Sequence, residues 1–160
     1  MSLESAIRQD GRQSPTARAL QRGVLRHFAA LGLTGLPEVP LACGRRADIV
    51  ALDAKGEITI VEIKSSVADF RADAKWPSYL IHCDRFLFAV TVDFPLDLLP
   101  VDVGVLVGDA FGAQVVRAPP RHPLSALARK AMLLRLARIG AARLSALQDP
   151  DFRLYTDSLD

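Results

Sequence analysis

The sequence predicts an α/β fold in which helices flank a mixed central sheet. A helical segment is followed by three strand-like segments, a second helical segment and further strands, an order that suits a layered sandwich. The segments 58–63 and 85–92 are almost continuous apolar runs, which are typical of strands buried on both faces. With 160 residues, half of them hydrophobic, the chain can bury one core without disulfides or structural metals.

The composition excludes several classes of protein. The two cysteines, Cys43 and Cys83, form no Cys-x-x-Cys or Cys/His cluster, which excludes a zinc module of ordinary spacing. The N-terminal residues have no apolar core of signal-peptide length, and Pro100 and Asp102 break the best candidate for a membrane span. We therefore expect a cytoplasmic protein that does not insert into a membrane.

The chain divides into one domain and two short ends. Residues 1–14 are polar and without apolar period, so we expect a flexible N-terminal arm. Residues 15–148 form the predicted domain, and residues 149–160 form an acidic C-terminal tail. The formal net charge is only +2, but the segment 110–148 holds seven Arg or Lys residues and no acid. Such a segment suits a polyanion, although a solvated helix is the commoner explanation.

The first helix is predicted over residues 15–31. Pro15 suits its first turn, Ser14 suits its N-cap, and Gly32 ends it. An apolar stripe at helical spacing is formed by Ala19, Leu20, Val24, Leu25 and Phe28. The stripe indicates that one side of this helix packs on the sheet.

The segments 48–52 and 58–63 predict a β-hairpin. Both are rich in β-branched residues, and the turn 53–56 between them ends in a glycine where a positive φ is wanted. A three-residue loop in this turn sets Asp48 directly opposite Glu62. The hairpin therefore brings two carboxylates together.

The predicted hairpin carries charges where a buried sheet should carry none. Residues two apart on a strand share a face, so Lys64 joins Asp48 and Glu62. A cation such as Mg²⁺ or Mn²⁺ would relieve the repulsion of the carboxylates, with the carbonyl of Ile63 as a further oxygen ligand. Lys64 would then orient or deprotonate a water that attacks a phosphate. The alternative is a solvated face or a cross-strand ion pair.

A second helix is predicted directly after Lys64. Ser66 suits its N-cap, with Asp69 three residues on, and the helix is expected to continue through Ala74. Asp69 and Asp73 suit the positive end of the helix dipole. This gives both acids a structural explanation.

The remaining segments complete the sheet and add a last helix. The segment 36–42 contains two prolines, which favour an edge strand because proline cannot donate to a central ladder. Strands are predicted at 85–92, 101–107 and 113–117, and a long helix at 125–147. The cations of that helix spread around its axis, which weakens it as a track for phosphates.

Cationic and aromatic side chains flank the predicted carboxylates. Three arginines four residues apart form one ridge on the first helix, and Pro77 would bend the chain so that its neighbours point toward the site. The predicted DNA contacts are Arg18, Arg22, Arg26, Arg45, Arg46, Lys75, Trp76 and Tyr79. The alternatives are simple solvation for the cations and core packing for the aromatic rings.

These motifs resemble those of a known group of nucleases. An Asp that begins one strand and a Glu-x-Lys that ends the next resemble the PD-(D/E)xK superfamily, with Ala47-Asp48 in place of its Pro-Asp. The continuation is similar to the MmcB family of DNA repair proteins within that superfamily, over about 15–143. The similar residues are Val61 to Ser66, Asp69-Phe70-Arg71-Ala72-Asp73-Ala74-Lys75-Trp76, Tyr79, Cys83 to Phe86 and Phe88 to Val90. The run from Asp69 to Trp76 is the specific part.

The resemblance implies a restriction-endonuclease-like αβββαβ core and a metal-dependent DNA endonuclease acting in repair. It assigns catalysis to Asp48, Glu62 and Lys64, with 5′-phosphate and 3′-hydroxyl products. Related nucleases often carry another acidic ligand on the first helix, whereas 15–31 contains no acid, which leaves Gln21 as a neutral oxygen ligand. A catalytically inactive DNA- or protein-binding module is therefore the alternative.

The sequence contains no element that reads bases, such as a helix-turn-helix or a zinc finger. We therefore expect recognition through DNA structure or through a repair-protein partner. A homodimer is a further expectation, because many relatives in the superfamily act as dimers.

Overall fold

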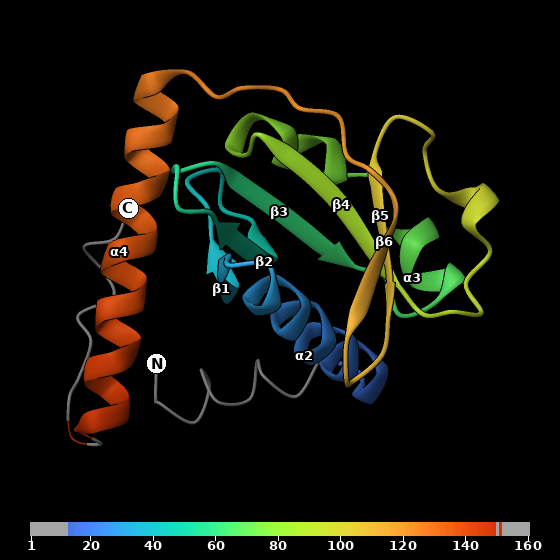
Figure 1. The fold of residues 1–160 in the computed structure, drawn as a ribbon, viewed down its shortest axis with the longest axis horizontal. Coiled ribbons are helices and arrows are strands. Elements are labelled where there is room, and N and C mark those ends of the chain that lie inside the picture. Colours follow the sequence, from blue (N-terminus) through green and yellow to red (C-terminus); the bar gives the residue numbers. More distant parts are fainter. Residues whose placement is uncertain (1–12, 150, 152–160) are drawn as a thin grey trace.

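Six strands stand in chain order in one mixed sheet (Figure 1). The structure is a computed structural model that describes residues 13–149 and 151. Strands β3, β4 and β5 run parallel, and the other neighbours are antiparallel. The elements are α2 (Pro15–Ala30), β1 (Thr34–Pro40), β2 (Arg46–Leu52), β3 (Ile58–Ile63), α3 (Val67–Ala72), the 3₁₀ helix η2 (Trp76–His82), β4 (Arg85–Val90), the 3₁₀ helix η3 (Leu96–Leu98), β5 (Gly104–Gly108), β6 (Ala113–Arg117) and α4 (Ala126–Gln148). The predicted mixed α/β fold is confirmed, and the element order agrees with αβββαβ.

Helix α2 covers one face of the sheet. Its N-cap is Ser14, whose Oγ accepts a hydrogen bond of 3.1 Å from the amide of Ala17. The buried side of the helix packs on residues of β2 to β5, and this cluster contains Leu20, Val24, Phe28, Ile49, Ala51, Val61, Ile63, Leu87, Ala89 and Leu106. The apolar stripe predicted from the sequence therefore does face the sheet, and it fixes the N-terminus of α2 beside the ends of β2 and β3.

The opposite face of the sheet carries the larger core. Phe70 from α3 meets Phe88 edge-on at a ring distance of 5.6 Å, and Trp76 from η2 stacks on Phe86 at 5.5 Å. Helix α4 stands beside β1 and contributes Met132, Leu136 and Ile139 to the same core (Figure 1). From the hairpin, Ala47, Val50, Ile58 and Ile60 belong to this core, whereas Ile49, Ala51, Val61 and Ile63 pack against α2.

Arginine side chains of α4 form a salt bridge and hydrogen bonds that hold this helix against the sheet. Arg129 forms a salt bridge of 2.6 Å with the buried Asp84. Arg135 donates to the carbonyl of Pro40, and Arg143 donates to the carbonyl of Glu38 at 2.6 Å. At least three of the seven cations in the segment 110–148 therefore have structural partners, which agrees with the expectation that α4 is a poor phosphate track.

Several element bounds differ from the sequence prediction by one or more residues, and those of β1, α3 and β5 have a clear structural reason. Strand β1 begins two residues early, at Thr34, although it is an edge strand as expected. Helix α3 ends at Ala72 because Asp73 adopts an extended conformation before the Pro77 bend. Strand β5 begins only at Gly104, since Val101 lies 88% exposed in the preceding turn.

The predicted N-terminal arm and C-terminal tail lie largely outside the described residues. Only Gln13, Ser14, Asp149 and Asp151 of those two segments are described. Within residues 13–149, each helix is too short or too polar to cross a lipid bilayer.

Candidate functional site

The hairpin of β2 and β3 has the predicted register. Ile49 pairs with Val61 and Leu52 with Ile58, so one further step sets Asp48 opposite Glu62. Glu62 belongs to a strand in which every residue is buried, and it is itself only 8% exposed. The amide of Ile63 donates a hydrogen bond of 2.7 Å to Oδ2 of Asp48, which fixes the first carboxylate against the end of β3. The register and this bond thus bring the two carboxylates to the same end of the hairpin.

Lys64 follows β3 and points to the same face as Glu62. Its amide donates to the carbonyl of Ala89 at 2.9 Å, which anchors its backbone to β4. Its side chain is buried, and Nζ lies 2.7 Å from Oδ2 of Asp73 but 3.9 Å from Oε1 of Glu62. The ammonium therefore pairs with Asp73, an acid to which the sequence had assigned no role in the site.

A cavity of about 260 Å³ opens at this end of the sheet. Asp48, Glu62, Ile63 and Lys64 line it from the sheet. Its other walls include Gln13, Ser14 and Ala17 at the start of α2. The carboxylates and the ammonium thus face one space that a ligand can enter.

Burial makes ionisation of the two carboxyls costly. Loss of hydration and the neighbouring charge of Asp48 raise the pKa of Glu62 to about 9. Burial also raises the pKa of Asp48 to about 6, although the Ile63 amide favours its charged form. Oε2 of Glu62 is buried and has no hydrogen-bond partner among the described residues. A pair of desolvated carboxyls with an unpartnered oxygen is an environment that a cation would stabilise.

Tyr79 and Trp76 lie in the core, where the sequence had predicted DNA contacts. Tyr79 is 5% exposed, stacks near Phe86, and donates its hydroxyl hydrogen to the carbonyl of Arg46 at 3.0 Å. The same hydroxyl lies 3.5 Å from Oε1 of Glu62. A buried ring cannot stack on a base, so the prediction for Tyr79 is corrected to a structural position. Trp76 is half-buried between Phe86 and Phe88, which gives it the same structural explanation.

The predicted cationic contacts remain at the surface. Arg18, Arg22 and Arg26 are exposed along α2, and Lys75 is exposed after α3. Arg46 lines the cavity and forms a salt bridge of 2.8 Å with Glu38. Arg45 is half-exposed in the turn before β2. These positions leave the cations accessible to a polyanion.

Gln21 does not line the cavity. It lies in α2, one turn beyond Ala17, and its amide nitrogen is buried without a hydrogen-bond partner among the described residues. The side of α2 that reaches the cavity carries Gln13, Ser14 and Ala17 instead. Among residues 13–149 and 151, no group of three or more His, Cys, Asp or Glu side chains is arranged to hold a metal ion. Two more acids line the cavity, but Glu38 is paired with Arg46 and Asp69 accepts hydrogen bonds from Ser65, so the candidate site rests on Asp48 and Glu62.

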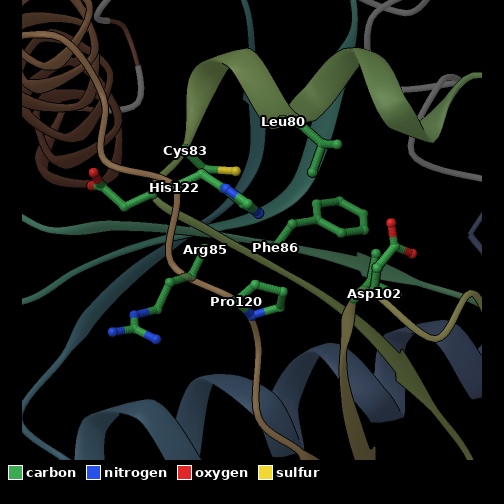
Figure 2. A pocket seen from close by; sticks show the side chains of 9 residues that line it. Leu80, Cys83, Arg85, Phe86, Asp102, Pro120 and His122 are labelled. Carbon is green, nitrogen blue, oxygen red and sulfur yellow. The ribbon is translucent and has the colours of Figure 1, made fainter.

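A second hollow, of about 50 Å³, lies between η2, the start of β4 and the segment that leads to α4 (Figure 2). Cys83, Phe86 and Leu80 line it together with Pro120 and His122. This volume holds only a few water molecules. Asp84, which also lines this hollow, accepts hydrogen bonds from Arg129 of α4. The region therefore has a structural role, because it connects the start of β4 to α4.

The sequence interpretation missed the role of Asp73. It placed Asp73 at the positive end of a helix dipole, but the residue is the C-cap of α3 and so lies at the opposite end. The signal that could have identified it is its place in the Asp-Phe-Arg-Ala-Asp-x-Lys-Trp run, where a second acid precedes the Lys75–Trp76 bend.

Comparison with known proteins assigns the chain to a family. The family model described as DNA repair protein MmcB-like matches residues 4–151. This chain belongs to the MmcB-like family of DNA repair proteins. The match includes the hairpin, the Asp73 run and all of α4, so the cavity described above is part of the MmcB-like domain.

A solved structure shares the MmcB-like fold of this chain. It is the SPO1766 protein of unknown function from Silicibacter pomeroyi, which is 42% identical and superposes with a TM-score of 0.84. The alignment covers 89% of this chain and 98% of that one. No sequence among the curated proteins matches this chain.

Proposed function

We propose that this MmcB-like protein is a metal-dependent DNA endonuclease of the PD-(D/E)xK superfamily that acts in DNA repair. The observation that carries the proposal is the register that sets Asp48 opposite Glu62, with Lys64 two residues farther on the same face. This is the arrangement that the motif of the superfamily requires. The cavity in front of the three side chains gives a phosphodiester access to them.

The residues present fit a divalent cation. Asp48 and Glu62 offer carboxylate oxygens, the donors that Mg²⁺ and Mn²⁺ prefer, and Oε2 of Glu62 is free to bind one. Ile63 lines the cavity, and we assign its carbonyl as a third ligand. Gln21 is left out of the ligand set because it lies outside the cavity lining. Water and phosphate oxygens would complete the coordination, as is usual for Mg²⁺.

Each side chain then has a distinct task. A cation held by Asp48 and Glu62 would supply Lewis-acid polarisation and make a bound water more acidic. Lys64 donates hydrogen bonds from its ammonium to the attacking water or to a phosphate oxygen, and so stabilises the charge that develops there. The product would carry a 5′-phosphate on one strand end and a 3′-hydroxyl on the other.

The exposed cations supply the affinity for DNA in this proposal. Arg18, Arg22 and Arg26 extend along α2 from the end that reaches the cavity, Arg46 lines the cavity, and Arg45 and Lys75 directly precede Arg46 and Trp76 in the chain. Contacts of this kind bind the phosphate backbone without reading bases. Recognition would then depend on DNA structure or on a repair-protein partner.

A second function is favoured by one specific observation. Helix α2 contains no acidic residue, and two carboxylates hold a cation less firmly than three. A DNA-binding module that keeps the fold without cleaving is therefore the alternative. It predicts DNA binding that neither needs Mn²⁺ nor depends on Glu62.

Metal binding and cleavage by the wild-type protein test the proposal together. We expect Mn²⁺ binding by calorimetry, and Mg²⁺- or Mn²⁺-dependent cleavage of at least one of duplex, nicked, branched or single-stranded DNA. Asp48→Asn and Glu62→Gln should lose both properties, whereas Asp97→Asn, which removes an exposed acid outside the cavity, should keep both. Wild-type protein that binds DNA but neither binds Mn²⁺ nor cleaves would overturn the nuclease in favour of the binding module.

A further inference from the structure

We propose that Asp73 is a positioning residue that holds the Lys64 ammonium away from Glu62 and so leaves the Glu62 carboxylate free for a cation. This inference rests on the proposed function, because it assigns a task to an acid beside the same metal site. Asp73 is not placed among the ligands, and it acts only through Lys64.

The distances define a competition between two carboxylates for one ammonium. Nζ of Lys64 lies 2.7 Å from Oδ2 of Asp73, a direct hydrogen bond, and 3.9 Å from Oε1 of Glu62. Lys64 is only 4% exposed, so its ammonium is poorly hydrated and favours a carboxylate partner. Glu62, in contrast, keeps Oε2 buried without a partner among the described residues. The Lys64 ammonium therefore pairs with Asp73 and not with Glu62, although Glu62 is only two residues away in the sequence.

The carboxylate of Asp73 is fixed from both sides. Its Oδ1 accepts a hydrogen bond of 2.9 Å from the amide of Lys75, and its own amide donates to the carbonyl of Phe70. Phe70 before it and Trp76 after it are anchored in the aromatic core against Phe88 and Phe86. The fold thus presents Asp73 to Lys64 as a rigid acceptor and not as a mobile surface acid.

Removal of Asp73 would redirect Lys64. The nearest carboxylate oxygen left is Oε1 of Glu62, which a small rotation of the lysine side chain can reach from 3.9 Å. A buried ammonium and carboxylate attract strongly, because little water screens them. The resulting Lys64–Glu62 pair would occupy the carboxylate that the cation needs. Asp73 therefore prevents Lys64 from pairing with the Glu62 carboxylate that a cation would need.

Mn²⁺ affinities of single and double variants test this role. We expect Asp73→Ala to weaken Mn²⁺ binding by about 10-fold or more, the usual scale for losing a residue that supports a ligand from outside the coordination sphere. Lys64→Ala should bind Mn²⁺ at least as tightly as wild type. The double variant Asp73→Ala/Lys64→Ala should return to within about threefold of Lys64→Ala, because no ammonium is left to compete. If Asp73 were itself a ligand, the double variant would stay as weak as Asp73→Ala, and this result would overturn the proposal.

Two further variants separate positioning from a change of charge or of fold. Asp97→Ala removes the same charge at an exposed position outside the cavity and should change Mn²⁺ affinity by less than about threefold, since solvent screens an exposed acid. Asp73→Asn keeps an acceptor for the Lys75 amide, so it should remain folded and give an intermediate loss of affinity. Equal losses in Asp97→Ala and Asp73→Ala would count against positioning.

A measurement on metal-free protein distinguishes failure of this inference from failure of the nuclease proposal. The ¹⁵N–¹H signal of the Lys64 ammonium should show a hydrogen-bond correlation to the carboxyl carbon of Asp73 in the wild type, and to that of Glu62 in Asp73→Ala. Absence of Mn²⁺ binding with these correlations present would reject the metal site alone. If the Lys64 signal were the same in wild type and Asp73→Ala, or showed no correlation to Glu62 in the variant, the role proposed for Asp73 would be rejected.

Discussion

The amide of Ile63 donates a hydrogen bond of 2.7 Å to Oδ2 of Asp48. This bond joins the first carboxylate of the candidate site to the residue directly after the second, across the two strands of one hairpin. A slip of β2 by one residue would move Asp48 out of its place opposite Glu62 and break this bond. The same contact thus sets both the hairpin register and the relative position of Asp48 and Glu62.

Stability of the metal-free protein should fall as pH rises, because of Glu62. Burial and the charge of Asp48 raise the folded-state pKa of Glu62 to about 9 from its ordinary 4.5. The folded protein therefore keeps a proton that the unfolded chain releases, and the stability present below about pH 4.5 is lost as pH rises toward 9. In the presence of a chelator, Tm should fall by several degrees over this range, since about 1 kcal/mol moves Tm by roughly 2–4 °C in a chain of this size.

Glu62→Gln should remove most of that pH dependence. The amide has the same shape and does not ionise, so Tm of the variant should change little between pH 5 and pH 9 apart from the smaller effect of Asp48. Asp97→Asn serves as the control and should follow the wild-type curve. Equal slopes in wild type and Glu62→Gln would contradict the assignment of this titration to Glu62.

The hairpin and its charged residues were predictable because they depend on local rules. Strand periodicity and one short turn determine that Asp48, Glu62 and Lys64 share a face, and these rules need no knowledge of the rest of the chain. The N-caps Ser14 and Ser66 follow from similarly local chemistry. For this reason the sequence predicted the centre of the site and the elements around it.

The partners of these residues were not predictable in the same way. Asp73 reaches Lys64 only because the chain leaves α3 in an extended conformation and is anchored by aromatic contacts. Tyr79 lies in the core because η2 packs against β4, whereas its sequence position beside Lys75 suggested the surface. Arg143 finds its acceptor at Glu38, more than 100 residues away in the chain. Such pairings depend on tertiary packing, which local patterns do not encode.

Reversal of the arginine ridge should weaken DNA binding and its dependence on salt. Arg22→Glu/Arg26→Glu removes two proposed phosphate contacts, so the slope of log K against log salt should fall by about two units. Affinity for DNA without sequence preference should fall as well. Fluorescence anisotropy with labelled DNA over a range of salt concentrations measures both quantities.

The control for this experiment has the same change in net charge at the other end of the molecule. Lys55→Glu/Lys130→Glu lies beside the hairpin turn, far from the cavity end of the strands, and both side chains are exposed. It should lower affinity much less and leave the salt slope near that of the wild type. Equal effects of the two double variants would show that α2 is not the binding surface.

The Asp84–Arg129 pair should contribute to stability and not to the site. Asp84 is 1% exposed and accepts hydrogen bonds from the amides of Ile58 and Leu124 as well as from Arg129. Arg129→Ala leaves this buried carboxylate without its counter-charge, so we expect a loss of about 3 kcal/mol or more in the free energy of unfolding, measured with urea. Mn²⁺ binding by the folded fraction should not change.

The same pair predicts a loss of stability in acid. Although burial opposes ionisation, the hydrogen bonds from Arg129 and the two amides lower the pKa of Asp84 to about 2. The stability that this carboxylate contributes is therefore present above about pH 4 and is lost as pH falls toward 2. Arg129→Ala should show a smaller loss of Tm over that range, and an unchanged acid dependence would contradict this assignment.

Lys64→Ala separates catalysis from metal binding. A protonated lysine cannot ligate a cation, so the variant should bind Mn²⁺ as tightly as the wild type or slightly more tightly, because a repelling charge has gone. Cleavage of the phosphodiester should fall by about 10²-fold or more, the usual scale for losing a positioned acid–base or charge-stabilising group. Glu62→Ala should instead lose both properties. If the three side chains formed only a structural ion pair, either change would lower Tm and neither would have any activity to abolish. Cleavage that persists undiminished in Lys64→Ala would exclude the role proposed for Lys64, whatever the affinity for Mn²⁺.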